Sequence, residues 1–471
     1  MPVAFNETLG SLPPVWPDDL LSAIQRENAQ RPASIVVLDD DPTGTQTVHD
    51  VPVVTNWALL TIIKEFERQT PLFYVLTNSR SLPRAQAVDL AREAGANILE
   101  ASRQTGRAFD IISRSDSTLR GHFPAEVDAL LDVLDMERAV WLIVPFFKEG
   151  GRYTISDTHY VREAQQLIPA AETPFARDVV FGYVNSDLRY WVEEKTQGRF
   201  PAASVQSLSL KEIRQEGPDH IAGKLAGCEP GSVCVVNAAD YRDLEVVTLG
   251  LLQAQRQGHS FLFRTAASFV RVRGGLRGRS LLNANEMSGK DGSPGLVIVG
   301  SHVPKSSEQL DHVLQHANAQ SVELDVETIL SPPGRDELIR TALGLVENAL
   351  SQGKDVVVYT SRKLITGNDE ENSLFIGGQV SQALVALVRS MSIRPGYILA
   401  KGGITSSDIA TRALKIARAQ VLGQVLPGVP VWRAGAESKF PDMPYIVFPG
   451  NVGGTDAITQ VVSVFRASAD R

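Results

Sequence analysis

Short apolar runs that alternate with helix-period segments constrain the fold of this chain more than any other feature of its sequence. The runs that we expect to form buried strands are Ile35–Leu38, Leu72–Leu76, Val140–Val144, Val233–Val236, Leu296–Val299, Val356–Tyr359, Tyr397–Ala400 and Tyr445–Phe448. The segments with helical periodicity include Arg84–Glu100, Ala125–Leu134, Arg335–Ser351, Gly378–Met391 and Asp408–Ala419. This alternation predicts an α/β fold with largely parallel sheets, whose ligands bind beyond the carboxyl ends of the strands.

The chain of 471 residues is too long for one ordinary hydrophobic core, and it contains one segment with the character of a linker. Residues 271–294 are rich in Gly, Arg, Ser and Asn and show no apolar period, and a strand-like run follows them. We expect the arginines of this segment to be solvated or to pack against the neighbouring domain. The pattern predicts two α/β domains, an N-terminal one of residues 1–285 and a C-terminal one of residues 286–471.

Composition and charge exclude several classes of partner. The net charge is -8 and the sequence pI is about 5.6, which argues against nucleic acid or an anionic membrane as the main partner. Two cysteines, Cys228 and Cys234, suit neither a metal knuckle nor a disulfide framework, so we expect a reducing, cytoplasmic setting. No leader or long apolar run is evident, and no two histidines have the spacing of metal ligands. The sequence is compatible with a homo-oligomer.

Three carboxylates follow the first predicted strand directly, in the stretch "DDDPTGTQT". Asp39, Asp40 and Asp41 repel one another, and the pKa values of such packed carboxyls rise unless a metal or a hydroxyl-rich ligand is bound. Pro42 and Gly44 force a turn just after them. We interpret the stretch as a site for hydroxyls, a cation or both; the alternative is an acidic loop that caps the next element.

Two further loops at strand ends point to the same kind of ligand. "TNSRSLP" presents Arg80, whose guanidinium has the two-pronged geometry that a carboxylate binds. "SRSDSTLRGHFP" brings short hydroxyls, an aspartate and arginines together, namely Ser113, Arg114, Ser115, Asp116, Ser117, Thr118 and Arg120. Each of these residues alone would be an ordinary helix cap. Together they favour a polyhydroxylated anion as the ligand.

Three loops of the C-terminal half share one layout: an apolar strand, then glycine, then the start of a helix. They are "LVIVGSHVPKS", "YILAKGGITSSDIA" and "YIVFPGNVGGTDAI". Unpaired N–H groups and the positive end of the helix dipole make such turns suitable for phosphate. The residues that we expect to bind a nucleotide are Ser301, Gly402, Gly403, Thr405, Gly450, Asn451, Val452 and Gly453. Neither a P-loop nor a G-x-G-x-x-G fingerprint occurs.

These motifs together resemble those of the four-carbon acid sugar kinases. The segments that carry the resemblance are Asp40–Gly44, Arg80, Asp116–Gly121, Pro145–Thr154, Thr173–Asp178, Arg264–Ser268, Gly300–Ser301, Lys401–Ser406 and Gly450–Asp456. The resemblance implies an N-terminal domain that binds a sugar acid, a C-terminal domain that binds ATP with Mg²⁺, and an active site in the interdomain cleft. It implies phosphorylation of the terminal hydroxyl of threonate, erythronate, a 3-oxo-tetronate or a related branched acid.

Within this resemblance we assign roles to the candidate residues. Arg80, Arg120 and the loop Ser115–Thr118 are expected to hold the carboxylate and the inner hydroxyls of the acid, and Asp40 and Asp41 to accept hydrogen bonds from hydroxyls. No residue is assigned as a direct metal ligand. The candidates for the catalytic base are Asp41, Asp116 and Asp456. For the last of these, a carboxylate placed at a helix start by the helix dipole is an equally good explanation.

Two other functions compete with the kinase. Asp39 and Asp41 match the D-x-D-x-T motif of haloacid-dehalogenase-like phosphatases, with Asp240 and Asp243 as a faint match for the later acidic pair. That interpretation leaves the glycine loops of the C-terminal half unexplained. A non-catalytic ligand sensor built on an enzyme fold is the third possibility, and the concentration of reactive groups argues against it.

Overall fold

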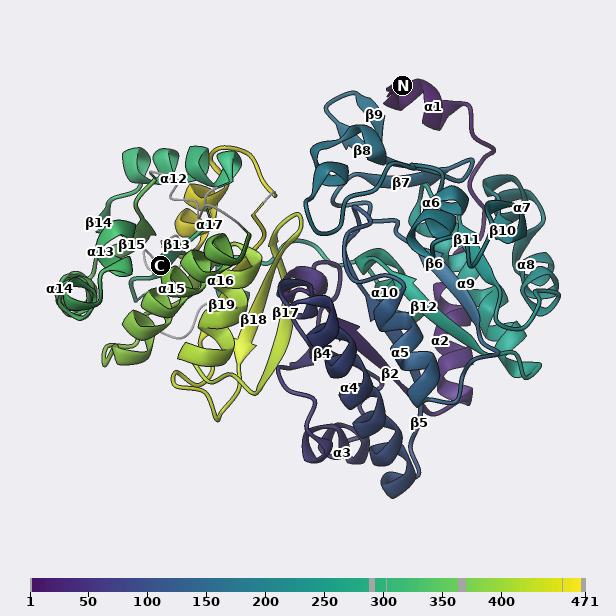
Figure 1. Ribbon diagram of the computed structural model, residues 1–471, viewed down its shortest axis with the longest axis horizontal. Coiled ribbons are helices and arrows are strands. Elements are labelled where there is room, and N and C mark those ends of the chain that lie inside the picture. Colours follow the sequence, from purple (N-terminus) through teal and green to yellow (C-terminus); the bar gives the residue numbers. More distant parts are fainter. Residues whose placement is uncertain (1, 288–292, 302, 363–369, 451, 467–471) are drawn as a thin grey trace. The chain divides into compact units, whose positions relative to one another are not determined.

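The computed structural model describes residues 2–287, 293–301, 303–362, 370–450 and 452–466 (Figure 1). The chain forms two compact units. The N-terminal unit comprises Met1–Val48 and Asn56–Gly278, and the C-terminal unit comprises His49–Thr55 and Arg279–Arg471. Both units contain parallel strands connected through helices, which confirms the predicted α/β fold class. Within the described residues, no helix is both long and apolar enough to cross a membrane.

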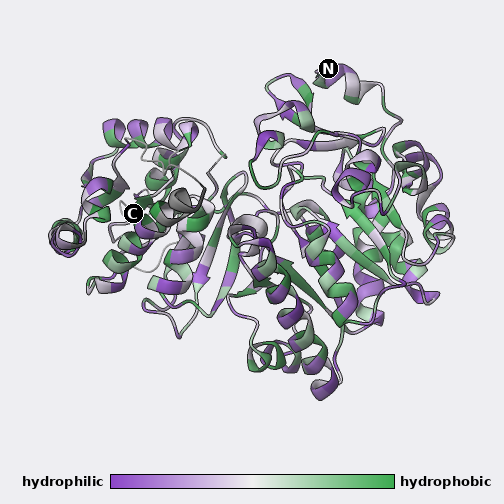
Figure 2. Ribbon diagram, viewed as in Figure 1, coloured by the Kyte–Doolittle hydropathy of each residue, from purple (hydrophilic) through white to green (hydrophobic). Residues whose placement is uncertain are grey.

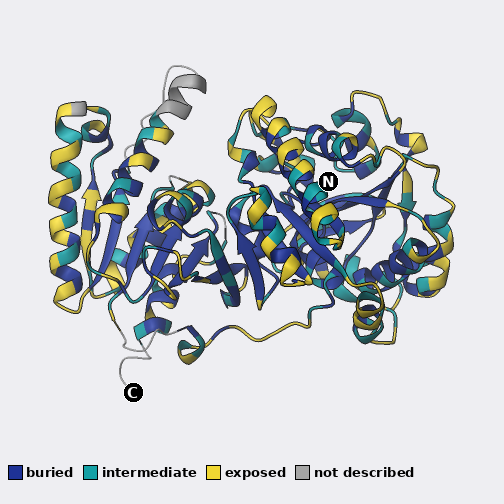
Figure 3. Ribbon diagram, turned by 90° about the horizontal axis from the view of Figure 1, so that it is seen from below, coloured by how far each residue is buried: buried dark blue, intermediate teal, exposed yellow. Residues whose placement is uncertain are grey.

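A seven-stranded parallel sheet forms the centre of the N-terminal unit. Its strands, in spatial order, are β10 (Gln206–Leu208), β11 (Val233–Val236), β6 (Val140–Val144), β12 (Phe261–Thr265), β5 (Ala108–Arg114), β2 (Ala33–Asp39) and β4 (Leu72–Leu76). The inner strands are apolar along their length because helices bury both faces of such a sheet. Figure 2 shows these strands as hydrophobic, and Figure 3 shows them as buried.

The helices of this unit follow the periodicity of the sequence. The long helix α4 (Arg84–Thr105) begins after Pro83 and ends at Gly106, whose φ of 69° stops the helix. Its buried residues recur at the helical period and are Ala87, Leu90, Ala91, Ala94, Gly95, Ile98 and Ala101. It packs against α5 (Ala125–Val133), and α9 (Tyr241–Arg256) packs against α2 (Leu21–Gln30) and α8 (Gly217–Ala226) (Figure 1).

A small antiparallel sheet also belongs to the N-terminal unit. Its strands, in spatial order, are β1 (Val3–Ala4), β9 (Gln166–Pro169), β8 (Thr158–Glu163) and β7 (Arg152–Ile155). The helix α10 (Ala267–Arg273) follows β12 and occupies the beginning of the predicted linker. Arg273 is 2% exposed and forms an ion pair of 2.5 Å with Asp110. The expectation of solvated arginines is therefore wrong at this position, because the arginine neutralises a buried carboxylate.

The sheet of the C-terminal unit is parallel over five strands and antiparallel at one side. Its strands, in spatial order, are β3 (Val51–Val54), β17 (Arg418–Leu426), β18 (Val429–Ala434), β19 (Pro444–Phe448), β16 (Ile398–Lys401), β13 (Leu296–Val299), β15 (Asp355–Thr360) and β14 (Ala319–Leu324). The strand β3, the first in this order, comes from the early part of the sequence. It pairs with β17 from Arg418 opposite Val54 to Val421 opposite Val51.

The helices of the C-terminal unit agree with the sequence patterns except in one place. The predicted segments Arg335–Ser351 and Gly378–Met391 lie almost entirely in α14 (Pro332–Ser351) and α15 (Glu370–Ser390). The predicted helix Asp408–Ala419 is wrong: α16 (Gly403–Asp408) begins earlier, continues as a π-helical turn to Ala413, and β17 begins at Arg418. The helices α12 (Pro304–His316) and α17 (Ala457–Arg466) follow β13 and β19. Apolar residues of α17 pack against the sheet in the core of the unit.

Candidate functional site

Opposite charges meet at the carboxyl ends of two neighbouring strands in the N-terminal unit. Asp39 ends β2 and Arg114 ends β5, and these two residues lie opposite each other in the sheet register. Arg114 Nη1 lies 2.9 Å from Asp39 Oδ1 and 3.8 Å from Asp40 Oδ1, and all three residues are buried. Burial is the main reason that the pKa of Asp39 is raised to about 7, and the ion pair with Arg114 opposes it. This aspartate is therefore a structural partner of Arg114 rather than an exposed nucleophile.

Arg80 gathers carboxylates from two different loops. It lies in a 3-10 turn after β4, at Ser79–Ser81. Its guanidinium bonds to Asp41, and it lies 3.5 Å from Asp116 Oδ1 and 3.9 Å from Asp40 Oδ1. Burial alone would raise the pKa of Asp41, but the positive charges of Arg80 and Arg114 and the hydrogen bonds from Thr43 together lower it, so that this carboxyl stays ionised.

The loop that follows β5 is held by its own charges. Arg120 Nε donates to Asp116 Oδ2 at 2.6 Å, the hydroxyl of Thr118 bonds to the same carboxylate, and Ser115 Oγ donates to Asp40 Oδ2 at 2.5 Å. Although burial would raise the pKa of Asp116, the guanidinium of Arg120 leads the effects that hold it well below its usual range. The structure thus brings the predicted acid-binding residues together in one place.

Three buried side chains hold the backbone of this loop. Arg264 Nη2 donates to the carbonyl of Arg120 at 2.6 Å, and Tyr183 Oη donates to the carbonyl of Thr118 at 2.8 Å. His159 Nε2 lies 2.7 Å from the carbonyl oxygen of Ser117, and burial lowers the pKa of His159 to about 4. The neutral imidazole therefore donates from Nε2 at neutral pH. Arg264 lies in one of the sequence motifs, whereas Tyr183 and His159 lie outside them, and spacing alone gives no sign that the three support one loop.

A small cavity lies beside the carboxylate of Asp40. It has room for about 10 Å³ of water-centre positions, which is enough for roughly one water molecule. Its polar lining includes Asp40, Thr77, Ser113, Arg114 and Glu126. Burial is the main reason that the pKa of Glu126, on α5, is raised to about 7. Asp40 Oδ1 is buried without a hydrogen-bond partner, so the cavity offers an unsatisfied acceptor to a water or a hydroxyl.

Arg152 is the functional candidate that sequence reasoning missed. It begins β7, and its Nε atom is buried without a hydrogen-bond partner. Across the described residues, it forms no ion pair with a carboxylate; its Nη1 donates to the carbonyl of Gly150. Its guanidinium lies 5.7 Å from the ring centroid of Phe175, and that of Arg120 lies 5.2 Å from the same centroid. The motif around "GRYT" contained this arginine, but only the fold shows that no described carboxylate forms an ion pair with it.

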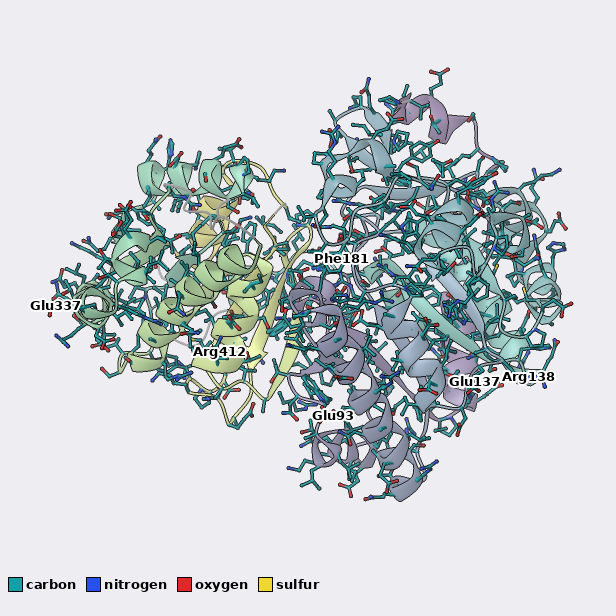
Figure 4. The ribbon with its side chains drawn as sticks, viewed as in Figure 1. Glu93, Glu137, Arg138, Phe181, Glu337 and Arg412 are labelled. Atoms are coloured by element: carbon teal, nitrogen blue, oxygen red, sulfur yellow. The ribbon has the colours of Figure 1, made fainter. Side chains whose placement is uncertain are left out.

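Phe175 belongs to the segment Thr173–Asp178, which also contacts Arg120 through a carboxylate. Asp178 Oδ2 lies 3.5 Å from Arg120 Nη1. Phe181, labelled in Figure 4 among the side chains of the N-terminal unit, packs edge-on against His122 with ring centroids 4.9 Å apart. The segment Thr173–Asp178 that resembled the family thus contacts the loop Ser115–Arg120 through both a ring and a carboxylate.

In the C-terminal unit, the three glycine turns follow three neighbouring strands. Gly300 follows β13, Gly402 follows β16 and Gly450 comes shortly after β19, and these strands are adjacent in the order β19-β16-β13. Gly402 has a φ of 108° and its N–H donates to the carbonyl of Phe448 at 2.8 Å. A side chain at Gly300 would approach Thr405 Oγ1 to 2.6 Å, so only glycine permits this close approach.

The remaining predicted residues of this unit lie around the same turns. Ser306 Oγ donates to Ser301 Oγ at 3.2 Å, and Gln309 Nε2 donates to the carbonyl of Val452 at 3.0 Å. Asn451 lies outside the described residues. Asp456 is exposed just before α17, and its Oδ2 accepts a hydrogen bond from Gln460. Asp456 thus belongs to the C-terminal unit, whereas the other two base candidates belong to the N-terminal unit.

Comparisons with known proteins agree with this division of the chain. Residues 35–273 match the model of a sugar-binding N-terminal domain, and residues 296–458 match that of a nucleotide-binding C-terminal domain. The chain belongs to the four-carbon acid sugar kinase family. The first model covers the acid-binding candidates and the second covers all three glycine turns. The resemblance predicted from the motifs is therefore confirmed.

Curated relatives of this family cover almost the whole chain. A D-threonate kinase of Salmonella typhimurium is 25% identical over 445 residues, which cover 90% of this chain and 96% of that protein. A D-erythronate kinase of Heliobacterium modesticaldum is 25% identical over 451 residues, with 90% and 95% covered. A solved Haemophilus influenzae protein has a TM-score of 0.60 at 18% identity, with 91% of this chain and 100% of that chain covered. At this identity the structural likeness concerns the fold.

No finding supports the phosphatase alternative. Asp240 caps α9 in a capping box with Asp243, whose carboxylate also takes a two-pronged ion pair from Arg214 at 2.7 and 2.8 Å. Asp243 and Arg214 are both buried. The acidic pair that suggested a phosphatase therefore has a structural role at a helix start.

Proposed function

We propose that this family member is an ATP-dependent kinase that phosphorylates the terminal hydroxyl of a four-carbon or related branched sugar acid. The observation that carries the proposal is the mixed cluster of Asp40, Asp41, Arg80, Asp116 and Arg120 in the sugar-binding domain. Carboxylates accept hydrogen bonds from hydroxyls and guanidinium groups bind carboxylates. Such a cluster suits a ligand that carries both groups. The names of the curated relatives support the same class of substrate.

The carboxylate of the acid is expected to bind at the arginines. Arg80 is already engaged by Asp41 and Asp116, so it contributes a partly neutralised charge. Arg152 has an unpartnered Nε and no carboxylate among the described residues, so we assign it the largest share of the acid's negative charge. The hydroxyls of Ser115, Ser117 and Thr118 and the free oxygen of Asp40 are then available for the inner hydroxyls of the acid.

Asp41 and Asp116 suit the role of orienting the acceptor hydroxyl. Arg80 and Arg120 keep both carboxyls ionised at neutral pH. A carboxylate with a low pKa is a weak base, but the loose transition state of phosphoryl transfer asks for little deprotonation before the phosphate arrives. Hydrogen bonding that aligns the hydroxyl is the larger requirement. Asp456 is the alternative on the nucleotide side, where it stands exposed at the start of α17.

The nucleotide is expected to bind at the three glycine turns of the C-terminal unit, through Ser301, the backbone at Gly402 and Gly403, Thr405 and the turn Gly450–Gly453. Mg²⁺ usually keeps several waters and binds through substrate phosphates. In the parts of the chain that are described, no three His, Cys, Asp or Glu side chains are grouped to hold a metal ion. A bound Mg²⁺ would neutralise phosphate charge, and the side chains here do not form a dedicated cage for it.

A screen for ADP release tests this proposal. The purified protein is assayed with ATP, Mg²⁺ and a panel of four-carbon and branched sugar acids, and the matched neutral tetritols serve as controls. We expect ADP release with at least one acid and none above background with the tetritols, because the arginines require a carboxylate. Equal turnover of acids and tetritols, or phosphate release from esters without ATP, would contradict the proposal.

A further inference from the structure

Lys401, the last residue of β16, is buried without an anionic partner. Its relative exposure is 0%, and it is one of the largest fully buried side chains. Nζ donates to the carbonyl of Pro449 at 2.6 Å and lies 4.2 Å from the ring centroid of Phe448. Over the described parts of the chain, no carboxylate forms an ion pair with it. Burying an ammonium group costs several kcal/mol of free energy in proteins. One carbonyl and the face of one aromatic ring compensate only part of this cost.

The surroundings of Lys401 add positive rather than negative charge. Burial is the main reason that its pKa is lowered to about 7, and the charge of Lys305 on α12 lowers it further. Arg362, after β15, donates to the carbonyl of Ser301 at 2.6 Å. The carboxylate of Asp408, at the end of α16, is bonded to Ser381 and lies 3.4 Å from Arg412, which Figure 4 labels. The helix α17 carries no acidic residue, and Asp456, which directly precedes it, is exposed.

The position of Lys401 connects this charge to the nucleotide site. In the sheet register it lies between Val299 of β13 and Phe448 of β19, so it occupies the middle one of the three strands that end in glycine turns. The next residue is Gly402, and the acceptor Pro449 directly precedes Gly450. The ammonium group therefore ties the beginning of one glycine turn to the beginning of another.

We propose that Lys401 is the positioning cation of the nucleotide site, which holds the beginnings of the turns at Gly402 and Gly450 together and stabilises the negative charge of the phosphates bound there. This inference deepens the proposed function, because it assumes that the nucleotide binds at these turns. A polyanion placed above an ammonium group favours its protonated form. Nucleotide binding near neutral pH is therefore linked to uptake of a proton by Lys401.

Calorimetric titration with a non-hydrolysable ATP analogue and Mg²⁺, in two buffers with different ionisation enthalpies, measures this uptake. A pKa of about 7 leaves the ammonium roughly one quarter protonated at pH 7.5, so full protonation on binding takes up roughly three quarters of a proton. Lys401→Met keeps the length of the side chain and removes the charge. We expect this variant to lose the uptake and to bind the analogue roughly tenfold more weakly or worse.

Two further variants make the test specific. Lys401→Arg carries a charge that does not titrate near pH 7, so it should bind the analogue without proton uptake. Lys354→Met removes an exposed lysine at the amino end of β15, the opposite end of a parallel strand, and should leave both affinity and uptake unchanged. If the wild-type protein binds the analogue without taking up a proton, or if Lys401→Met binds it as tightly, the inference is overturned. If no adenine nucleotide binds to the wild-type protein, the proposed function fails instead.

Discussion

Arg80 and Arg152 have different partners, so their removal should separate stability from acid binding. Arg80 is 18% exposed and stands against Asp41, Asp116 and Asp40. The variant Arg80→Ala leaves these carboxylates in a largely buried site without their shared cation. Removing one partner of a buried ion pair costs roughly 3–5 kcal/mol, and the partial exposure places this variant near the lower end of that range. We therefore expect a loss of roughly 3 kcal/mol in the free energy of unfolding.

Arg152→Ala removes a guanidinium that has no carboxylate partner among the described residues. The substitution removes the contact with Phe175, which destabilises the fold, but it also removes an uncompensated buried charge, which stabilises it. Because these effects oppose each other, the free energy of unfolding should change by no more than about 1 kcal/mol. A hydrogen bond to a charged group contributes roughly 1.5–3 kcal/mol, which corresponds to a rise of about 10- to 100-fold in the KM for the acid. The KM for ATP should stay unchanged.

Urea unfolding and steady-state kinetics with the best acid of the panel measure both quantities for each variant. Arg152→Lys is the matched control, because it keeps the positive charge but loses the two-pronged geometry of the guanidinium, and it should have an intermediate KM. The reasoning is refuted if Arg152→Ala binds the acid as the wild type does, or if it loses as much stability as Arg80→Ala. The second result would mean that Arg152 has a structural partner in solution.

Three other substitutions test separate parts of the N-terminal unit. Gly44→Ala would place a methyl group against the Asp39 carboxylate and displace that carboxylate from Arg114. We expect the free energy of unfolding, measured in urea, to fall by at least roughly 3 kcal/mol. A smaller effect would show that the turn can shift. Glu126→Gln should remove a pH dependence of the free energy of unfolding. The pKa of Glu126 rises from 4.5 to about 7 on folding, so its contribution to stability is present below pH 4.5 and lost as the pH rises through 7. The variant should therefore be more stable than the wild type at pH 8 but not at pH 4. Asp243→Asn should cost roughly 3–5 kcal/mol in unfolding experiments while the remaining folded protein keeps its kcat; a specific loss of kcat would reopen a catalytic role for this aspartate.

The sequence predicts the parallel strands well because burial on both faces of such a sheet leaves a continuous apolar run. The sequence predicts strand pairing less well where the two paired strands are far apart along the chain. Val51–Val54 is a short apolar run within the N-terminal half, and nothing local shows that it pairs with Arg418–Leu426 of the C-terminal unit. The error at Asp408–Ala419 has a local cause: the segment is rich in alanine, a strong helix former, although the helical turns end at Ala413 and the strand β17 begins at Arg418.

The acid-binding cluster follows from topology alone. Residues just after neighbouring parallel strands must meet at one edge of the sheet, so Asp40, Arg80 and Asp116 could be grouped without a structure. The residues that the sequence did not single out are those whose importance depends on a missing partner. Arg152 and Lys401 lie in motif segments without an assigned role, and only their surroundings show that neither basic side chain has a counter-ion among the described residues.

The balance of positive and negative side chains differs between the two units, and the difference matches the two substrates of the proposed reaction. In the N-terminal unit, Arg80, Arg114 and Arg120 are each paired with aspartates, so their charges are largely balanced, and Arg152 forms no ion pair among the described residues. This balance suits a ligand with a single carboxylate and several hydroxyls. Around the glycine turns of the C-terminal unit, Lys305 and Lys401 have no ion pair among the described residues, and the helix starts add further positive potential. An excess of that kind is stable only when a polyanion completes the site, which is what the phosphates of a nucleotide supply.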